Sequence, residues 1–164
     1  MRKVILGNLL FHDVRLSADN TVSCSSCHGL NIGGVDNKQF SEGVGGQFGG
    51  VNAPSVYNAH YNFVQFWDGR AATLADQAAG PPLNPVEMAC KSFDEICEKL
   101  NADAAFSKAF KEVYPDGFNQ ANITDAIQEF ERTLLTPNSR FDKYLKGDNA
   151  ALTAEELAGY DRSE

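Results

Sequence analysis

The sequence predicts an all-α fold with long glycine-rich loops. Apolar residues recur at helical spacing in several short segments, whereas the strict alternation that is typical of β-strands is almost absent. A stretch from Gly29 to Gly50 is too rich in glycine for regular helix or strand. The length of 164 residues with 43% hydrophobic content suits one soluble domain with a core of its own.

The elements of the first half are short. Residues 3–11 carry apolar side chains at Val4, Leu6, Leu9 and Leu10, which indicates a short helix. Residues 29–50 should form a loop, and loops of this length in a compact domain usually carry function or wrap a ligand. Residues 53–62 are expected to form one or two helical turns opened by Pro54.

Helical segments fill the second half of the chain. The pattern of residues 72–80 predicts a short helix that ends at Gly80. The pattern of residues 92–102 predicts a second helix, which opens with Ser92 and Glu95 in capping-box register. Two further helices are expected around 103–114 and 122–135, and the segments 139–147 and 153–162 are helical at the end of the chain. The expected apolar faces are Ala105, Phe106, Ala109, Phe110 and Val113 in the first of these helices, and Ile123, Ile127, Phe130 and Leu134 in the second.

One short motif carries chemistry. Cys24-Ser-Ser-Cys27-His28 has the C-x-x-C-H spacing of c-type haem attachment. Two thiols one helical turn apart can form thioethers at one edge of a porphyrin, and the next residue places an imidazole under the iron. A redox dithiol or half of a zinc site is the alternative, but no second ligand pair and no βαβ pattern supports either. One covalent haem c, with His28 as its proximal ligand, is therefore expected.

The other two cysteines, Cys90 and Cys97, do not form a second such pair. On a continuous helix their Cα atoms would lie about 10 Å apart, which is too far for a disulfide. Two free thiols are the simpler interpretation, and a disulfide is open only if Cys90 lies before the helix begins.

The sequence offers few side chains for the far side of the iron. In electron-transfer cytochromes a methionine or a second histidine closes that position. The candidates are Met1, His12, His60 and Met88, and each has an ordinary alternative role at the surface or in the core.

The net charge of −8 argues against nucleic acid and against anionic membranes as partners. No apolar run approaches the roughly 18 residues of a membrane span. The first residues lack the long apolar core of a signal peptide, so we read them as the front of a mature chain. Covalent haem attachment implies export, and a periplasmic location is expected.

Several stretches together resemble the N-terminal, peroxidatic haem domain of bacterial di-haem cytochrome c peroxidases, a family that includes MauG-like enzymes. They follow one another in family order from about residue 6 to 149 and read LGNLLFHDVRLS, SCSSCHGLNIGGVD, NAPSVYNAHYNFVQFWDGRA, LADQAAGPPLNPVEM and LLTPNSRFDKYLKGD. The resemblance implies a cytochrome c-like haem domain over residues 1–164.

The resemblance also implies roles for individual residues. Cys24 and Cys27 would hold the low-potential haem above His28. Glu87 falls on the distal-pocket glutamate that moves a proton between the two peroxide oxygens, and Gln77 on a glutamine that orients peroxide or water. Trp67 falls on the tryptophan between the two haems, and Asn52 on an asparagine of a calcium site between the domains.

Two departures from the family pattern matter. Many members carry a histidine in the glycine-rich loop that closes the distal iron position, whereas this chain has Val44 there. Valine cannot bind iron, so the position is expected to be open or filled by water. The chain also has no second C-x-x-C-H motif, so the second haem domain of the family is expected to be absent from it.

The sequence therefore predicts a haem peroxidase domain that reduces hydrogen peroxide with electrons from a small cytochrome c or cupredoxin. A second haem domain or a second copy of the chain is a possible partner. Two alternatives stay open: a mono-haem cytochrome that carries electrons or binds small ligands, and a MauG-like oxidase.

Overall fold

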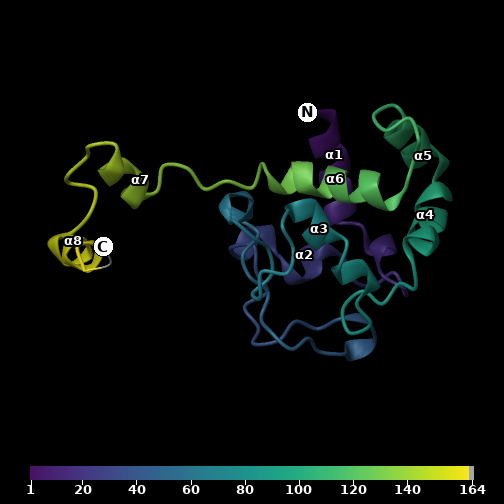
Figure 1. The fold of residues 1–164 in the computed structure, drawn as a ribbon, viewed down its shortest axis with the longest axis horizontal. Coiled ribbons are helices and arrows are strands. Elements are labelled where there is room, and N and C mark those ends of the chain that lie inside the picture. The colour runs from purple at the N-terminus through teal and green to yellow at the C-terminus, as the bar shows by residue number, and fades with distance from the viewer. Residues whose placement is uncertain (163–164) are drawn as a thin grey trace. The chain divides into compact units, whose positions relative to one another are not determined.

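The computed structural model describes residues 1–162 and confirms the all-α class, with about half of the chain in helices (Figure 1). Only isolated β-bridges, and no β-sheet, occur among these residues. The α-helices are α1 (Arg2–Phe11), α2 (Cys24–Cys27), α3 (Leu74–Ala78), α4 (Phe93–Asn101), α5 (Ala104–Lys111), α6 (Gln120–Glu131), α7 (Arg140–Leu145) and α8 (Ala154–Tyr160). The 3₁₀ turns are η1 (Val14–Leu16), η2 (Leu30–Ile32), η3 (Val44–Gly46), η4 (Ala59–Tyr61) and η5 (Pro81–Leu83).

The chain divides into a first unit, Met1–Leu134, and a second unit, Leu135–Glu164. The second unit is built on α7 and α8, and each helix begins with a capping box, at Ser139 and Thr153. Within this unit Arg140 donates to the carboxylate of Glu156 at 2.8 Å. The rings of Phe141, Tyr144 and Tyr160 pack together nearby.

The core of the first unit is centred on the crossing of α1 and α6 (Figure 1). Gly7 sits at the crossing, where a Cβ atom would lie 1.8 Å from the carbonyl oxygen of Ala126, so only glycine allows this approach. Phe11 meets Phe130 edge to face at 5.3 Å. The apolar residues predicted for the helix over 122–135 are all buried, namely Ile123, Ile127, Phe130 and Leu134. The helix itself is shorter at its end than predicted, because α6 stops at Glu131 and Leu134 lies in the turn that follows.

Two helices, α4 and α5, carry the rest of the core. The hydroxyl of Ser92 caps α4 by accepting from the backbone N–H of Glu95, as expected. The reciprocal bond of a capping box goes elsewhere, because the Glu95 carboxylate accepts from the backbone N–H of Lys91 instead. On α5 the expected face is only half right, since Phe106 and Phe110 are buried whereas Ala105 and Ala109 are exposed.

The segment 29–72 is irregular, as its glycines indicate, and it contains no α-helix. The helical turns expected over residues 53–62 shrink to the single 3₁₀ turn η4. The reason is Asn58, whose φ of 60° places it in the left-handed region and stops a helix from running through. The backbone N–H of Asn58 instead donates to the carbonyl oxygen of Leu134, which ties this loop to the end of α6.

Candidate functional site

The C-x-x-C-H motif forms the one-turn helix α2 and the residue after it. Ser23 caps α2, and the backbone N–H of Ser23 donates to the hydroxyl of Ser26 at 3.0 Å. Cys24 and Cys27 occupy the two ends of the helical turn, and both thiols are free. His28 follows at the C-cap, with its backbone N–H bonded to the carbonyl oxygen of Cys24.

The imidazole of His28 is oriented by the backbone of the loop that follows. Its Nδ1 lies 3.2 Å from the carbonyl oxygen of Gly34. Because a carbonyl can only accept, Nδ1 carries the proton and Nε2 keeps its lone pair. Burial lowers the pKa of His28, so the ring is neutral near pH 7. A neutral imidazole that is oriented by backbone carbonyl groups is what a metal-binding histidine requires.

The two thiols lie in poorly solvated surroundings. Burial raises the pKa of Cys24 to about 12, with a smaller contribution from the charge of Glu131. Burial also raises the pKa of Cys27, against the opposing effect of the Ser41 hydroxyl. Both side chains are therefore thiols and not thiolates, which is unlike a reactive redox dithiol.

These residues fit a covalent haem c better than a zinc ion. No group of three or more His, Cys, Asp or Glu side chains in the described part of the chain is arranged to hold a metal ion by itself. Two thiols and a neutral imidazole on one helical turn match the three attachment points that a haem c needs.

Glu87 lies in a loop of residues 84–90, which we call the Glu87 segment. The side chain is half-buried, and burial raises its pKa above the ordinary range of a glutamate. The positive charge of Arg70 and a hydrogen bond with Asn84 act in the opposite direction. Burial thus favours the protonated carboxyl group, whereas the nearby cation favours the carboxylate. These opposing effects are suitable for acid–base chemistry.

A second loop, residues 43–47, packs directly against the Glu87 segment, and we call it the glycine loop. The backbone N–H of Val44 donates to the carbonyl oxygen of Glu87 at 2.7 Å, and the side chain of Gln47 donates to the carbonyl oxygen of Pro85 at 3.1 Å. A Cβ atom on Gly43 would lie 2.2 Å from the carbonyl oxygen of Val86. The structure thus brings Val44 and Glu87 together, two positions that the sequence separates by more than forty residues.

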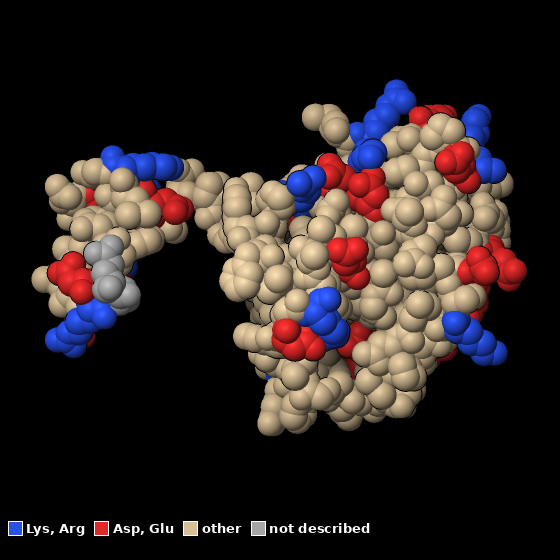
Figure 2. Space-filling view, viewed as in Figure 1, with Lys and Arg blue, Asp and Glu red and all other residues tan. Residues whose placement is uncertain are grey.

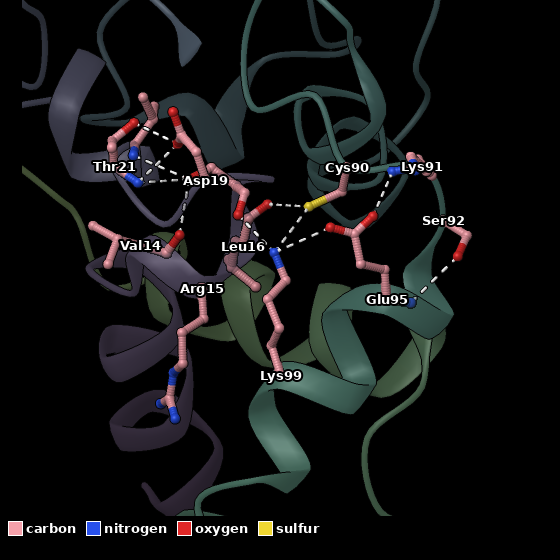
Figure 3. A network of polar contacts seen from close by, with 12 residues as sticks. Val14, Arg15, Leu16, Asp19, Thr21, Cys90, Lys91, Ser92, Glu95 and Lys99 are labelled. Carbon is pink, nitrogen blue, oxygen red and sulfur yellow. Dashed lines mark hydrogen bonds and ion pairs between the residues drawn. The ribbon is translucent and has the colours of Figure 1, made fainter. Parts of the chain in front are cut away.

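The other side of the Glu87 segment is anchored through a polar network (Figure 3). Lys99 reaches from α4 and donates to the carbonyl oxygen of Ser17 at 2.7 Å, while it pairs with Glu95 at 3.3 Å. The thiol of Cys90 lies 3.6 Å from Lys99 Nζ and donates to the carbonyl oxygen of Leu16. Cys90 is therefore a buried free thiol, and Cys97 is free as well, in line with the simpler interpretation of these two residues.

Trp67 and Asn52, both singled out by the sequence, are neighbours. The indole Nε1 of Trp67 donates to the backbone carbonyl oxygen of Asn52 at 3.1 Å. The indole itself is 66% exposed. Both residues line an open hollow of about 510 Å³, together with Lys38, Gln39, Phe40 and Val51. Gln77 lies apart from them, half-buried on the last turn of α3, and only its backbone groups form hydrogen bonds in the described structure.

The four candidates for an additional iron ligand occupy ordinary positions. Met88 is buried in the core, at 3% exposure, whereas Met1 is fully exposed. His12 is exposed and lies 2.9 Å from the carbonyl oxygen of Asn8. His60 is exposed too and accepts from Arg132.

Sequence reasoning missed three residues of this region: Arg70, Asn84 and Glu131. Arg70 stacks over the ring of Phe66 at 3.5 Å and forms an ion pair with Asp68. Glu131 is 5% exposed at the last position of α6. A signal for Glu131 was present, because it stands four residues after Ile127 and three before Leu134 and therefore shares the apolar face of the helix.

The surface and the helices add two observations. Figure 2 shows acidic and basic side chains interspersed on the visible face, with no extended basic area of the kind that binds nucleic acid. Within residues 1–162 no helix has the length and apolar character needed to cross a bilayer.

Comparisons with known proteins agree with this site. The family model of di-haem cytochrome c peroxidases matches residues 1–150. The chain is 62% identical, over 97% of its length, to the cytochrome c peroxidase Ccp of Escherichia coli (strain K12), of which it covers 34%. It is 50% identical, over 94% of its length, to the cytochrome c551 peroxidase of Nitrosomonas europaea (strain ATCC 19718), of which it covers 46%.

A solved structure shares the fold. The crystal structure of a MauG-like protein associated with microbial copper homeostasis superposes with a TM-score of 0.85 at 34% identity, over 98% of this chain and 48% of that one. The chain thus spans between a third and a half of the length of these proteins. From the C-x-x-C-H turn, the Glu87 segment and these matches, we conclude that the chain belongs to the family of di-haem cytochrome c peroxidases, whose members carry c-type haem.

Proposed function

We propose that this chain is the peroxidatic part of a cytochrome c peroxidase and reduces hydrogen peroxide to water at a single covalent haem c. The overall reaction is H₂O₂ + 2e⁻ + 2H⁺ → 2H₂O. The proposal rests on two features found together: a neutral, oriented His28 on the same turn as two free thiols, and a half-buried carboxyl group at Glu87. The named relatives support the same activity.

The residues of α2 would hold the cofactor. Cys24 and Cys27 would form the two thioether bonds, and Nε2 of His28 would bind the iron, while its Nδ1–H stays on the carbonyl oxygen of Gly34. Haem c bound here would supply the redox-active iron at which peroxide is reduced.

Glu87 would act as the acid–base group. Its carboxylate can accept the proton of one peroxide oxygen and return it to the oxygen that leaves as water. The positive charge of Arg70 lowers the pKa of Glu87 and so opposes the rise that burial causes. Gln77 would orient peroxide or water through its side-chain amide.

Val44 supports an open distal position. The glycine loop is bound to the Glu87 segment by the hydrogen bond from the backbone N–H of Val44 to the carbonyl oxygen of Glu87. The side chain of Val44 cannot bind iron. We infer that water or peroxide occupies this position without displacement of a side chain.

Electrons would enter from the side of Trp67. The exposed indole and the hollow beside it suit contact with a second haem domain or with a second copy of the chain, and Asn52 would contribute to a calcium site there. A small cytochrome c or a cupredoxin would be the electron donor, and the protein would work in the periplasm, since covalent haem attachment implies export.

The proposal is tested by Glu87→Gln in the haem-loaded chain. Glutamine keeps the size of the side chain but cannot accept a proton, so the rate of peroxide decay should fall about 100-fold or more while the haem optical spectrum stays unchanged. The matched control is Glu42→Gln, which changes an exposed carboxylate paired with Lys38 and should leave the rate as it is. Equal rates in Glu87→Gln and the unchanged chain would exclude Glu87 from the mechanism.

A further inference from the structure

Glu131 is a buried acid for which the peroxide chemistry has no use. Its side chain lies at the last position of α6 and the residue is 5% exposed. Among the described residues 1–162, its buried Oε2 has no hydrogen-bond partner. An unsatisfied buried carboxyl oxygen costs free energy, and such groups in native proteins often have a redox or catalytic role.

The surroundings of Glu131 favour its protonated form. The C-terminal end of a helix carries a partial negative charge, which disfavours a carboxylate. Burial raises the pKa of Glu131 to about 8, and no cation compensates for it. Four charged or titratable groups on or next to α1, α3 and α6 have partners other than Glu131: Lys3 pairs with Asp125, Asp76 with Thr73, Arg132 with Glu129, and His12 with the carbonyl oxygen of Asn8. Arg2, the first residue of α1, is not among the causes of the Glu131 pKa shift.

The Cys24 side chain packs against the core cluster that includes Ile127, Phe130 and Leu134, the apolar residues on either side of Glu131 in the sequence. The charge of Glu131 raises the pKa of the Cys24 thiol more than any other charged group does, ahead of Cys27 and Glu87. Cys24 would bind the porphyrin edge and not the iron. Glu131 is buried and Cys24 is half-buried, and charges interact over longer distances in such surroundings than in water.

From this placement we propose that Glu131 is a redox-linked proton site of the haem centre. When the centre gains one electron, the Glu131 carboxylate takes up one proton from solvent, and when the electron leaves, the carboxyl group releases that proton. Peroxide reduction consumes one proton for each electron, so such a site would bring protons in together with electrons. The inference rests on the haem attachment in the proposed function, but not on peroxide turnover.

The test is the pH dependence of the haem midpoint potential in the haem-loaded chain. The potential should fall as the pH rises through the range around 8, because removal of the Glu131 proton stabilises the oxidised haem. In Glu131→Gln, which mimics the protonated acid and cannot titrate, this fall should disappear. The control Glu129→Gln changes a carboxylate on the same helix that is paired with Arg132, and it should behave like the unchanged chain. An undiminished pH dependence in Glu131→Gln would overturn the proposal.

A second measurement does not use Glu131→Gln and therefore covers the case in which that variant does not fold. Glu87 also has a raised pKa, so the measurement is made in the haem-loaded Glu87→Gln chain. Redox-difference infrared spectra of that chain, with and without ¹³C-labelled glutamate, should show the C=O band of one protonated glutamate that gains intensity on reduction near pH 8. Absence of any such label-sensitive band would also overturn the proposal. Peroxide decay is measured separately, so a chain with the infrared band but no peroxidase activity would refute the proposed function and leave this inference standing.

Discussion

At the scale of single residues, the site depends on side chains that burial has shifted from their ordinary protonation. His28 is neutral, Cys24 keeps its proton, and Glu87 and Glu131 hold protons more tightly than exposed glutamates do. In each case loss of solvent is the largest cause. These four side chains thus lie in surroundings where a charge is costly.

Glu131 should make the stability of the fold depend on pH. Its pKa is about 8 in the folded chain and about 4.5 when exposed, so the folded state binds a proton that the unfolded state has lost. This contribution is complete below about 4.5 and disappears as the pH rises through 8. Between these values the free energy of unfolding should fall by about 1.4 kcal/mol per pH unit relative to Glu131→Gln.

Urea unfolding of both chains at several pH values measures this difference. Glu98→Gln, at an exposed position of α4, is the control and should follow the unchanged chain at every pH. Parallel pH profiles for Glu131→Gln and the unchanged chain would show that Glu131 is already ionised in the folded state.

The residue scale also shows where sequence reasoning succeeds. The C-x-x-C-H turn is predictable because the spacing of its cysteines and histidine along the chain is enough to identify it. The structure places Cys24, Cys27 and His28 on one turn. Glu131 and Arg70 were not predictable as site residues, because their importance comes from desolvation and from neighbours distant in sequence. Periodicity marks position 131 as buried, but it does not show that the carboxyl group lacks a partner.

At the scale of elements, the glycine loop and the Glu87 segment act as one piece. The bond from Val44 to Glu87 and the close approach at Gly43 fix the two loops together, and the Lys99 network holds the opposite side. Helix positions such as those of α1, α3 and α6 follow from apolar periodicity. The loop pairing does not, since a backbone contact between two irregular segments leaves no periodic signal in the sequence.

Gly43→Ala tests this pairing. The added Cβ would clash with the backbone of Val86 and Glu87, so the loops must separate, and the free energy of unfolding should fall by roughly 1–3 kcal/mol. Peroxide decay should slow in the same variant, because Glu87 moves with its backbone. Gly50→Ala is the matched control in the same glycine-rich stretch, where a Cβ would meet nothing within 4 Å. Thermal unfolding that is unchanged in Gly43→Ala would mean that the two loops are not packed as described.

At the scale of the whole molecule, the core and the site belong to the first unit. Every buried residue of the core cluster lies between Leu6 and Leu134, and so do all the predicted site residues. The all-α class and the succession of short helices were predictable from composition and periodicity. The run Thr136-Pro137-Asn138-Ser139 marks a loop in the sequence. The division after Leu134 was still not predictable, because a short loop between two helical segments does not show that the contacts of the core end there.

A chain that ends after Leu134 should therefore fold. It retains α1 to α6 and the bond between Asn58 and Leu134, so its circular dichroism per residue and its thermal midpoint should stay within a few degrees of those of the full chain. A chain that ends after Asn119 lacks α6, loses the partner of α1, and should be unfolded. Failure of the 134-residue chain to fold would show that the second unit contributes to the core.

The close approach of Gly7 to the backbone of Ala126 has a consequence for the order in which the parts of this protein fold. About 120 residues must be synthesised before the first helix meets its partner, so this contact closes a long loop and is expected to form late. Cys24 and Cys27 fall inside this span, and Cys24 packs against the core that α6 completes. During that interval the nascent polypeptide would leave both sulfhydryl groups accessible to the biogenesis machinery, and the late docking step would then close the interior around the newly made bonds.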